Sequence, residues 1–156
     1  MIGIAFHFQD PQTNFFSGIM DTVLDRIIFN ARNLGATHVF MIDQTRYRVG
    51  QYYQNSDSQV VLQRFESLQE LETAYSNVPF AYFENVRALE KVGIVSTSLP
   101  EFIHPSDVIY VFGTDSGGLQ ALGKESKTWV SIPVENLWSE GALNICLYDR
   151  LVKART

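Results

Sequence analysis

The residues best placed to do chemistry form a glycine-rich stretch in the last third of the chain. Residues 108–113, VIYVFG, are predicted to form a buried strand that runs directly into TDSGGL at 114–119. Such a turn at the carboxyl end of a parallel strand is where α/β proteins bind small ligands, because Gly113, Gly117 and Gly118 let the backbone approach a ligand closely. Ordinary turns after strands also use glycine, so both interpretations stay open. The spacing fits neither a P-loop nor a dinucleotide fingerprint.

Asn144 is a second candidate, in the first turn of a helix predicted at 142–153. Backbone N–H groups in a first turn have no partner within the helix, and they could hold a carboxylate or an RNA oxygen beside Asn144. A capping role for Asn144 is the equal alternative. The apolar stripe of this helix consists of Leu143, Cys146, Leu147, Leu151 and Val152.

A basic and aromatic cluster lies at 46–58, where Arg46 and Arg48 flank Tyr47 and two further tyrosines follow. Guanidinium groups hold phosphates and aromatic rings stack on bases, so this cluster favours RNA contact. A surface loop with two solvated arginines is the alternative. His7, within the first predicted strand, is more readily explained as a core or strand-edge histidine than as a catalytic one.

An α/β fold is needed to position these segments. A strand at 2–8, an amphipathic helix at 18–34 capped by Gly35, and a strand at 38–43 form a βαβ opening. Further strands are predicted at 60–65, 79–85 and 129–134, and further helices at 66–75 and 86–91. Because there is no internal repeat or low-complexity linker, we expect residues 1–156 to form a single domain: a mostly parallel sheet with helices on both faces.

The composition sets limits on function. The chain has 156 residues, is 46% hydrophobic and carries 12 basic against 17 acidic side chains, a net charge of −5. Non-specific nucleic-acid binders usually carry a basic surplus, so any RNA contact must use a local patch. Cys146, the single cysteine, excludes an internal disulfide and Cys-based zinc frameworks. With no long apolar run and no secretory signal at the N-terminus, we expect a cytoplasmic protein without a membrane span or a metal.

The order of the C-terminal segments closely resembles the SpoU/TrmH class of SPOUT RNA methyltransferases. The second motif of that class, FG-x-E-x-x-GL, stands here as FGTDSGGL at 112–119. The third motif, IP followed by SLN, stands here as Ile132-Pro133 and Ala142-Leu143-Asn144. The resemblance covers most of the chain and is strongest from residue 104 to the end.

The resemblance implies an α/β knot, in which the C-terminal segment threads through a loop to form a trefoil. It also implies that S-adenosyl-L-methionine binds bent in the knotted crevice, held mostly by backbone groups, with its adenine between apolar side chains. Ile132 and Leu143 would line this adenine slot, and Tyr82 or Phe83 would close it. The residues expected to contact the cofactor are Tyr82, Phe83, Phe112, Gly113, Ile132, Val134, Ala142 and Leu143.

Members of the class are homodimers that pair through the C-terminal helix, here 142–152. Leu143, Leu147 and Leu151 recur every four residues, and we expect this stripe to need a partner surface. Burial of the stripe against the chain's own sheet is the alternative.

The chain departs from the family pattern in its first motif. The family places an arginine six residues before the glycine that ends the first helix, and Phe29 occupies that position here. Arg26 and Arg32 are the nearest basic residues. In addition, Asp115 replaces a glutamate and Ala142 replaces a serine.

Two main functional hypotheses follow, with a structural dimer whose crevice stays empty as a third class. The first is a methyltransferase that modifies 2′-hydroxyls of tRNA or rRNA, with Asn144, Asp115 and Arg26 as catalytic residues and Arg46 and Arg48 binding the RNA. The second is a catalytically degenerate knot protein that binds cofactor or RNA without transfer. An arginine facing the crevice from the first helix favours the enzyme, and Phe29 alone in that place favours the binder.

Overall fold

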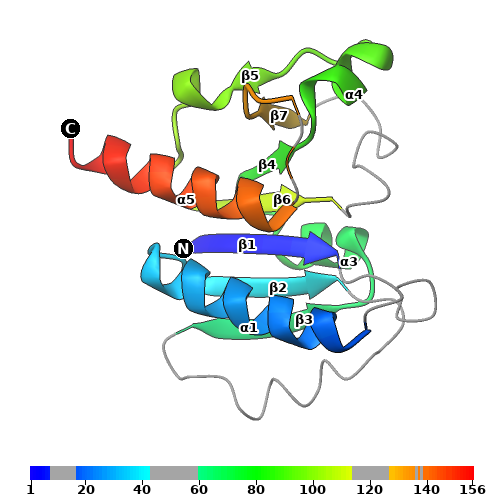
Figure 1. Cartoon of the computed structure of the whole chain (residues 1–156), viewed down its shortest axis with the longest axis vertical. Coiled ribbons are helices and arrows are strands. Elements are labelled where there is room, and N and C mark those ends of the chain that lie inside the picture. Colours follow the sequence, from blue (N-terminus) through cyan, green and yellow to red (C-terminus); the bar gives the residue numbers. More distant parts are fainter. Residues whose placement is uncertain (8–16, 43–59, 114–126, 136, 138) are drawn as a thin grey trace.

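A parallel sheet dominates the computed structural model, which describes residues 1–7, 17–42, 60–113, 127–135, 137 and 139–156, with the backbone alone described at 17–24. The strands are β1 (Ile2–His7), β2 (His38–Ile42), β3 (Val61–Phe65), β4 (Phe80–Phe83), β5 (Thr97–Ser98), β6 (Val108–Phe112) and β7 (Thr128–Ser131). Within the described residues they form one seven-stranded sheet in the order β3-β2-β1-β6-β4-β7-β5, and every neighbouring pair is parallel (Figure 1).

The expected βαβ opening is confirmed. Helix α1 (Ser17–Asn33) connects β1 to β2, and the two strands pair in parallel with Ile4 opposite Val39. Gly35 ends the helix with a φ of +92°, and its amide donates to the carbonyl of Arg32. That left-handed conformation is one that residues with a side chain rarely adopt, which explains the glycine at this C-cap.

Helices cover both faces of the sheet, as predicted. On one face lie α1 and α5 (Ser139–Ala154), packed side by side; α3 (Leu68–Ala74) covers the other, joined by α4 (Val86–Lys91) (Figure 1). Each face has its own buried core. Residues such as Phe6, Ala31 and Leu147 fill the first, and Phe40 and Leu71 fill the second. The central strands β1, β2, β4 and β6 are therefore largely apolar on both sides, as parallel strands between two helical layers must be.

The C-terminal helix begins one turn earlier than the sequence predicts. It starts at Ser139 rather than at residue 142, because contacts distant in sequence hold its first turn in place. The Ser139 hydroxyl donates to the carbonyl oxygen of Gly113, 26 positions away. Within the turn, Leu137 lies so close to Gly141 that a Cβ there would be 2.9 Å from its methyl carbon. The preceding strand ends at Ser131 rather than at residue 134, since the chain turns tightly through Pro133.

The apolar stripe of α5 packs mainly against the chain's own sheet. Leu143 and Leu147 are fully buried there, and Leu151 lies beside Gly35 at the end of α1. The stripe that motivated the dimer prediction is thus used inside the subunit. A different row on α5 stays exposed, formed by Ile145, Tyr148 and Val152. Placing Val152 in the apolar stripe is therefore wrong, because its side chain points to solvent beside Tyr148.

A polar network anchors the last two turns of α5 to the segment before β6. The side chain of His104 is buried, with Nε2 2.8 Å from an Asp149 oxygen and Nδ1 2.6 Å from the Tyr110 hydroxyl. Arg150 donates to the Tyr110 hydroxyl and to two backbone carbonyls, and Lys153 pairs with Asp149. A neutral His104 protonated on Nε2 satisfies the whole chain of hydrogen bonds, because it donates to the carboxylate and accepts from the tyrosine.

The predicted knot depends on how residues 114–126 pass the segment that leads into α5. Those residues lie outside the described part of the chain, so the threading remains an expectation from the sequence.

Candidate functional site

The two C-terminal motifs meet at the carboxyl edge of the sheet. Gly113 follows β6 and Ile132 follows β7, and β4 lies between these two strands. Phe83, the last residue of β4, stands in register with Phe112 on one side and with Val130 on the other. Because carboxyl ends of parallel strands share one edge, segments about 20 residues apart in sequence become neighbours around Phe83.

Apolar side chains of these segments gather beneath the first turn of α5. The rings of Phe83 and Phe112 stack with centroids 4.9 Å apart, and Leu143 belongs to the same buried cluster. Ile132 and Ala142 pack against it while staying partly accessible. Phe83, Phe112 and Leu143 are thus buried, and we call them the apolar floor; the partly accessible residues Ile132, Ala142 and Gly113 lie at its rim.

Tyr82 lies on the opposite face of the sheet from this cluster. Its hydroxyl donates to Glu72 at 2.6 Å, and its ring packs against Trp129 and beneath the Lys127 ammonium group. Burial, with Glu72 as a second cause, raises the pKa of the Tyr82 phenol. Since alternate residues of a strand point to opposite faces, the structure separates Tyr82 from the other expected slot residues and brings Phe83 to them.

Val134 stands at the rim of the site, beyond Pro133. Its amide donates to the Ile132 carbonyl at 2.7 Å, which closes a tight turn, and its side chain is exposed.

His7 lies at the end of β1, the strand beside β6, with its Nδ1 3.1 Å from the Phe112 carbonyl oxygen. Burial lowers the pKa of His7. It is the strand-edge histidine that the sequence indicates.

The side chain of Arg26 crosses from α1 to the first turn of α5. Its Nε and Nη2 donate to the two carboxylate oxygens of Glu140 at 2.8 and 3.0 Å. This paired hydrogen bond raises the pKa of Arg26 and lowers the pKa of the Glu140 carboxyl. Phe29, at the position of the family arginine, is 59% exposed, and the guanidinium of Arg32 lies 5.5 Å from the centre of its ring.

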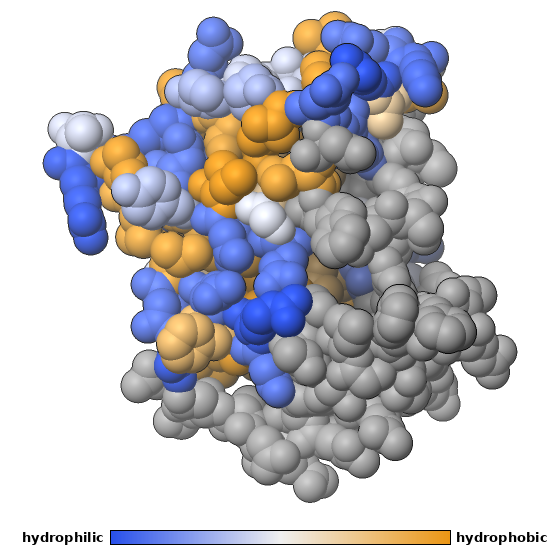
Figure 2. Space-filling model, viewed as in Figure 1, coloured by the Kyte–Doolittle hydropathy of each residue, from blue (hydrophilic) through white to orange (hydrophobic). Residues whose placement is uncertain are grey.

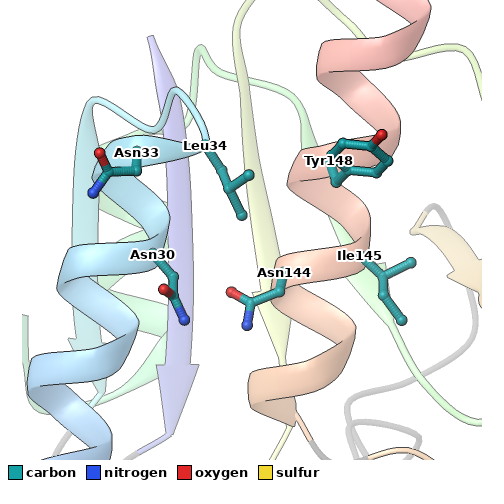
Figure 3. A pocket seen from close by; sticks show the side chains of 6 residues that line it. All are labelled: Asn30, Asn33, Leu34, Asn144, Ile145 and Tyr148. Carbon is teal, nitrogen blue, oxygen red and sulfur yellow. The ribbon is translucent and has the colours of Figure 1, made fainter.

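Asn144 faces a groove between α1 and α5. Because α5 starts at Ser139, Asn144 is its sixth residue and lies beyond the first turn. The prediction that Asn144 lies beside the free amide donors of the first turn is therefore wrong. Its Oδ1 is buried and has no hydrogen-bond partner among the described residues. In Figure 3, Asn30 and Leu34 of α1 and Asn144 of α5 point toward one another. The groove is lined by Asn30, Asn33, Leu34, Asn144, Ile145 and Tyr148.

Three predicted site residues, Asp115, Arg46 and Arg48, lie outside the described residues. Sequence reasoning missed Glu140 altogether. It is 114 positions from Arg26, and no periodicity or motif connects two residues at such a separation.

Among the described residues, no group of three or more His, Cys, Asp or Glu side chains is arranged to hold a metal ion. No helix in the same residues is long and apolar enough to cross a membrane.

Comparison with solved structures identifies the fold, whereas no protein-family model and no curated protein matches the sequence. The whole chain aligns with an RNA 2′-O-ribose methyltransferase at a TM-score of 0.70 and 18% identity, covering 57% of that chain. The SpoU methyltransferase AviRb from Streptomyces viridochromogenes, solved with S-adenosylmethionine, aligns over 98% of this chain and 60% of its own, with a TM-score of 0.66 and 16% identity.

A third similar structure is the TrmH/SpoU tRNA-modifying enzyme of A. aeolicus, at a TM-score of 0.67 and 13% identity over 99% of this chain and 76% of that one. The present chain therefore has the fold of SpoU/TrmH RNA methyltransferases, at low sequence identity. It spans 57–60% of the length of the first three structures that it matches.

Proposed function

We propose that this protein is an S-adenosylmethionine-dependent methyltransferase that acts on 2′-hydroxyls of tRNA or rRNA. The observation that carries the proposal is the meeting of Phe112-Gly113, Ile132 and Ala142-Leu143 around Phe83 at one edge of the sheet. The similar structures support it, since one is an RNA 2′-O-ribose methyltransferase and another contains S-adenosylmethionine.

The residues at this edge suit the cofactor. Ile132 and Ala142 are partly accessible and pack on the buried floor of Phe83, Phe112 and Leu143, so they offer apolar surface of the kind that a purine requires. Gly113, which is also partly accessible, would contact the rest of the molecule. Bound there, the cofactor would supply a methyl group activated by its positive sulfur.

The chain itself must orient the ribose and stabilise the charge that develops on its oxygen. A 2′-hydroxyl is a poor nucleophile. The activation free energy of transfer therefore depends mainly on aligning the ribose oxygen with the methyl group and on removing its proton or stabilising its developing charge. Arg26 and Arg32 are equally close in sequence to the expected position. The side chain of Arg26 reaches Glu140 in the first turn of α5, the helix that also carries Leu143 of the apolar floor. We infer that Arg26 stabilises this charge electrostatically, with Asp115 and Asn144 organising the site and Arg46 and Arg48 binding RNA phosphates.

The second candidate function is binding of cofactor or RNA without transfer. The observation that favours it is Phe29, which is exposed at the position of the family arginine. The apolar floor does not depend on that arginine, so the protein could bind the cofactor without transferring its methyl group.

We also infer that the protein is a homodimer through α5. Figure 2 shows apolar surface over α5 on this face of the molecule. The exposed row of Ile145, Tyr148 and Val152, at helical spacing, lies along this helix and partly lines the groove beside Asn144. Contiguous exposed apolar surface is the kind that partner proteins cover.

The test combines two measurements. Calorimetric titration with S-adenosylmethionine compares wild type with Gly113→Trp, which fills the rim, and with Ile103→Trp as a control, because Ile103 is 87% exposed and precedes the opposite end of β6. We expect binding by wild type and the control, and loss of binding by Gly113→Trp.

Methyl transfer from labelled cofactor into tRNA and rRNA of cells that lack the protein is the second measurement. Transfer supports the enzyme. Cofactor binding without transfer to any RNA would make the degenerate binder right. Absence of cofactor binding and of transfer would contradict the enzyme and the cofactor binder, and a titration with RNA would then decide whether the protein binds RNA alone.

A further inference from the structure

The paired hydrogen bond between Arg26 and Glu140 fixes the plane of the guanidinium group. Both carboxylate oxygens of Glu140 accept, from Nε and Nη2, at 2.8 and 3.0 Å. A bidentate pair of this kind restrains the direction of the guanidinium as well as its position, which a single contact would not do. Among the described residues, two of the five N–H groups of Arg26 have a partner, and the edge formed by Nη1 and the second hydrogen of Nη2 lies on the other side of the guanidinium from Glu140.

Glu140 is in turn held at the cofactor site. It lies between Ser139, whose hydroxyl donates to the Gly113 carbonyl, and Leu143 in the apolar floor, all within the first five residues of α5. Helical geometry keeps these three residues at fixed separations of a few ångströms. The carboxylate also lies at a helix N-terminus, where the helix dipole favours a negative charge. Glu140 is therefore a rigid support whose position follows that of Gly113.

We infer that Glu140 is the positioning residue for Arg26: it turns the free edge of the guanidinium toward the mouth of the site beside Gly113, where a ribose oxygen or phosphate would bind. This inference rests on the proposed function. It also accounts for a cation that reaches the first turn of α5 from a position three residues before Phe29. That displacement is about 4.5 Å along the helix, and an arginine side chain drawn toward α5 by a carboxylate can span it.

A purely structural role for the Arg26–Glu140 ion pair would have different experimental consequences. If the pair only joined α1 to α5, either orientation of its charges would serve. If Glu140 positions Arg26, the guanidinium must come from α1 and the carboxylate from α5. Reversing both residues in Arg26→Glu/Glu140→Arg separates these roles, since it keeps an ion pair and removes the cation from its place.

The experiment measures steady-state methyl transfer by wild type, Glu140→Gln, Glu140→Asp and the reversed pair, with Glu90→Gln as a control. Glu90 is an exposed glutamate on α4, so this control removes one negative charge elsewhere. We expect Glu140→Gln to lower kcat on the order of 10-fold or more, because small misplacements of a reacting group cost this much. KM for the cofactor and the activity of Glu90→Gln should stay unchanged, and Glu140→Asp should retain an intermediate kcat.

The reversed pair should recover the melting temperature that Glu140→Gln loses but not kcat. A reversed pair as active as wild type, or a Glu140→Gln variant with wild-type kcat, would overturn the positioning role while leaving the proposed function intact.

Hydrogen exchange of the Arg26 Nε–H, followed by NMR, tests the orientation without any turnover. We expect slow exchange in wild type and fast exchange in Glu140→Gln. If wild type transfers no methyl group, the proposed function fails by itself, and the exchange measurement still decides whether Glu140 holds the guanidinium. Equal exchange in the two proteins would refute that hold.

Discussion

Replacing His104 by phenylalanine should measure how firmly the C-terminal helix is anchored. The substitution keeps an aromatic ring of similar size and removes two hydrogen bonds, one to the Tyr110 hydroxyl and one to the Asp149 carboxylate. A neutral hydrogen bond contributes roughly 0.5–1.5 kcal/mol and a bond to a charged group roughly 1.5–3 kcal/mol. We therefore expect the free energy of unfolding to fall by about 2–4 kcal/mol, because His104 is buried and water cannot replace both partners.

The same substitution at His38 is a matched control. His38 has its Nδ1 2.8 Å from the neighbouring Thr37 hydroxyl, and its ring stacks on Phe40. Phenylalanine preserves the stacking, so His38→Phe should cost at most about 1.5 kcal/mol. Urea unfolding followed by circular dichroism gives both values. A His104→Phe variant no less stable than His38→Phe would refute the account of the network.

The pH dependence gives a second and independent measurement of His104. Burial lowers the pKa of His104 below its usual 6.5, although Asp149 opposes this effect. Below pH 6.5 the unfolded chain therefore binds a proton that the folded protein does not, and stability falls as the pH drops toward the folded pKa. Between pH 7 and 5, wild type should lose more stability than His104→Phe. Parallel pH profiles for the two proteins would contradict this.

Three further predictions concern the site, the RNA and the interface. Leu143→Ala should destabilise the protein by about 2–5 kcal/mol in urea unfolding and should weaken calorimetric binding of S-adenosylmethionine, and unchanged affinity would remove Leu143 from the adenine floor. Arg46→Ala and Arg48→Ala should each reduce the slope of log affinity against log salt by about one in RNA titrations, and a slope equal to wild type would exclude phosphate contact. Tyr148→Asp should convert a dimer into a monomer by light scattering, whereas a monomeric wild type at tens of micromolar concentrations would refute the interface.

The elements of the fold could be predicted because apolar periodicity and glycine punctuation are local signals. The βαβ opening with its cap at Gly35 is confirmed, as are helices on both faces. The start of α5 could not be predicted in this way. Its first turn depends on the bond from Ser139 to Gly113, 26 positions away, and a serine, a glutamate and a glycine in succession resemble a loop when read alone.

Which residues of the site share a face could be predicted only in part. In β4, Tyr82 and Phe83 are both buried, so no alternation of polar and apolar residues tells which one faces α5. The phenol of Tyr82 is satisfied by Glu72 in α3, a partner that no motif indicates. Likewise, the leucine stripe of α5 led to the prediction of a dimer interface, but a helix that packs on its own sheet shows the same leucine pattern. The sequence cannot separate these two cases. The structure does, because it shows the leucines buried and a different row, through Tyr148, exposed to solvent.

Introducing an arginine at position 29 separates an enzyme that relies on Arg26 from a degenerate binder. Phe29 is 59% exposed, so Phe29→Arg should change stability by no more than about 0.5 kcal/mol. Three residues along a helix correspond to about 4.5 Å and a 60° rotation, so the new cation would occupy the position of the family arginine without displacing Arg26 from Glu140. If Arg26 already stabilises the developing charge, Phe29→Arg should alter kcat less than threefold, and Phe29→Arg/Arg26→Ala should recover part of the activity that Arg26→Ala alone loses. If wild type binds the cofactor without transferring methyl groups, Phe29→Arg should create transfer where none exists. A double variant as inactive as Arg26→Ala would show that position 29 no longer faces the reacting groups, and that the cation at this site can come only from Arg26.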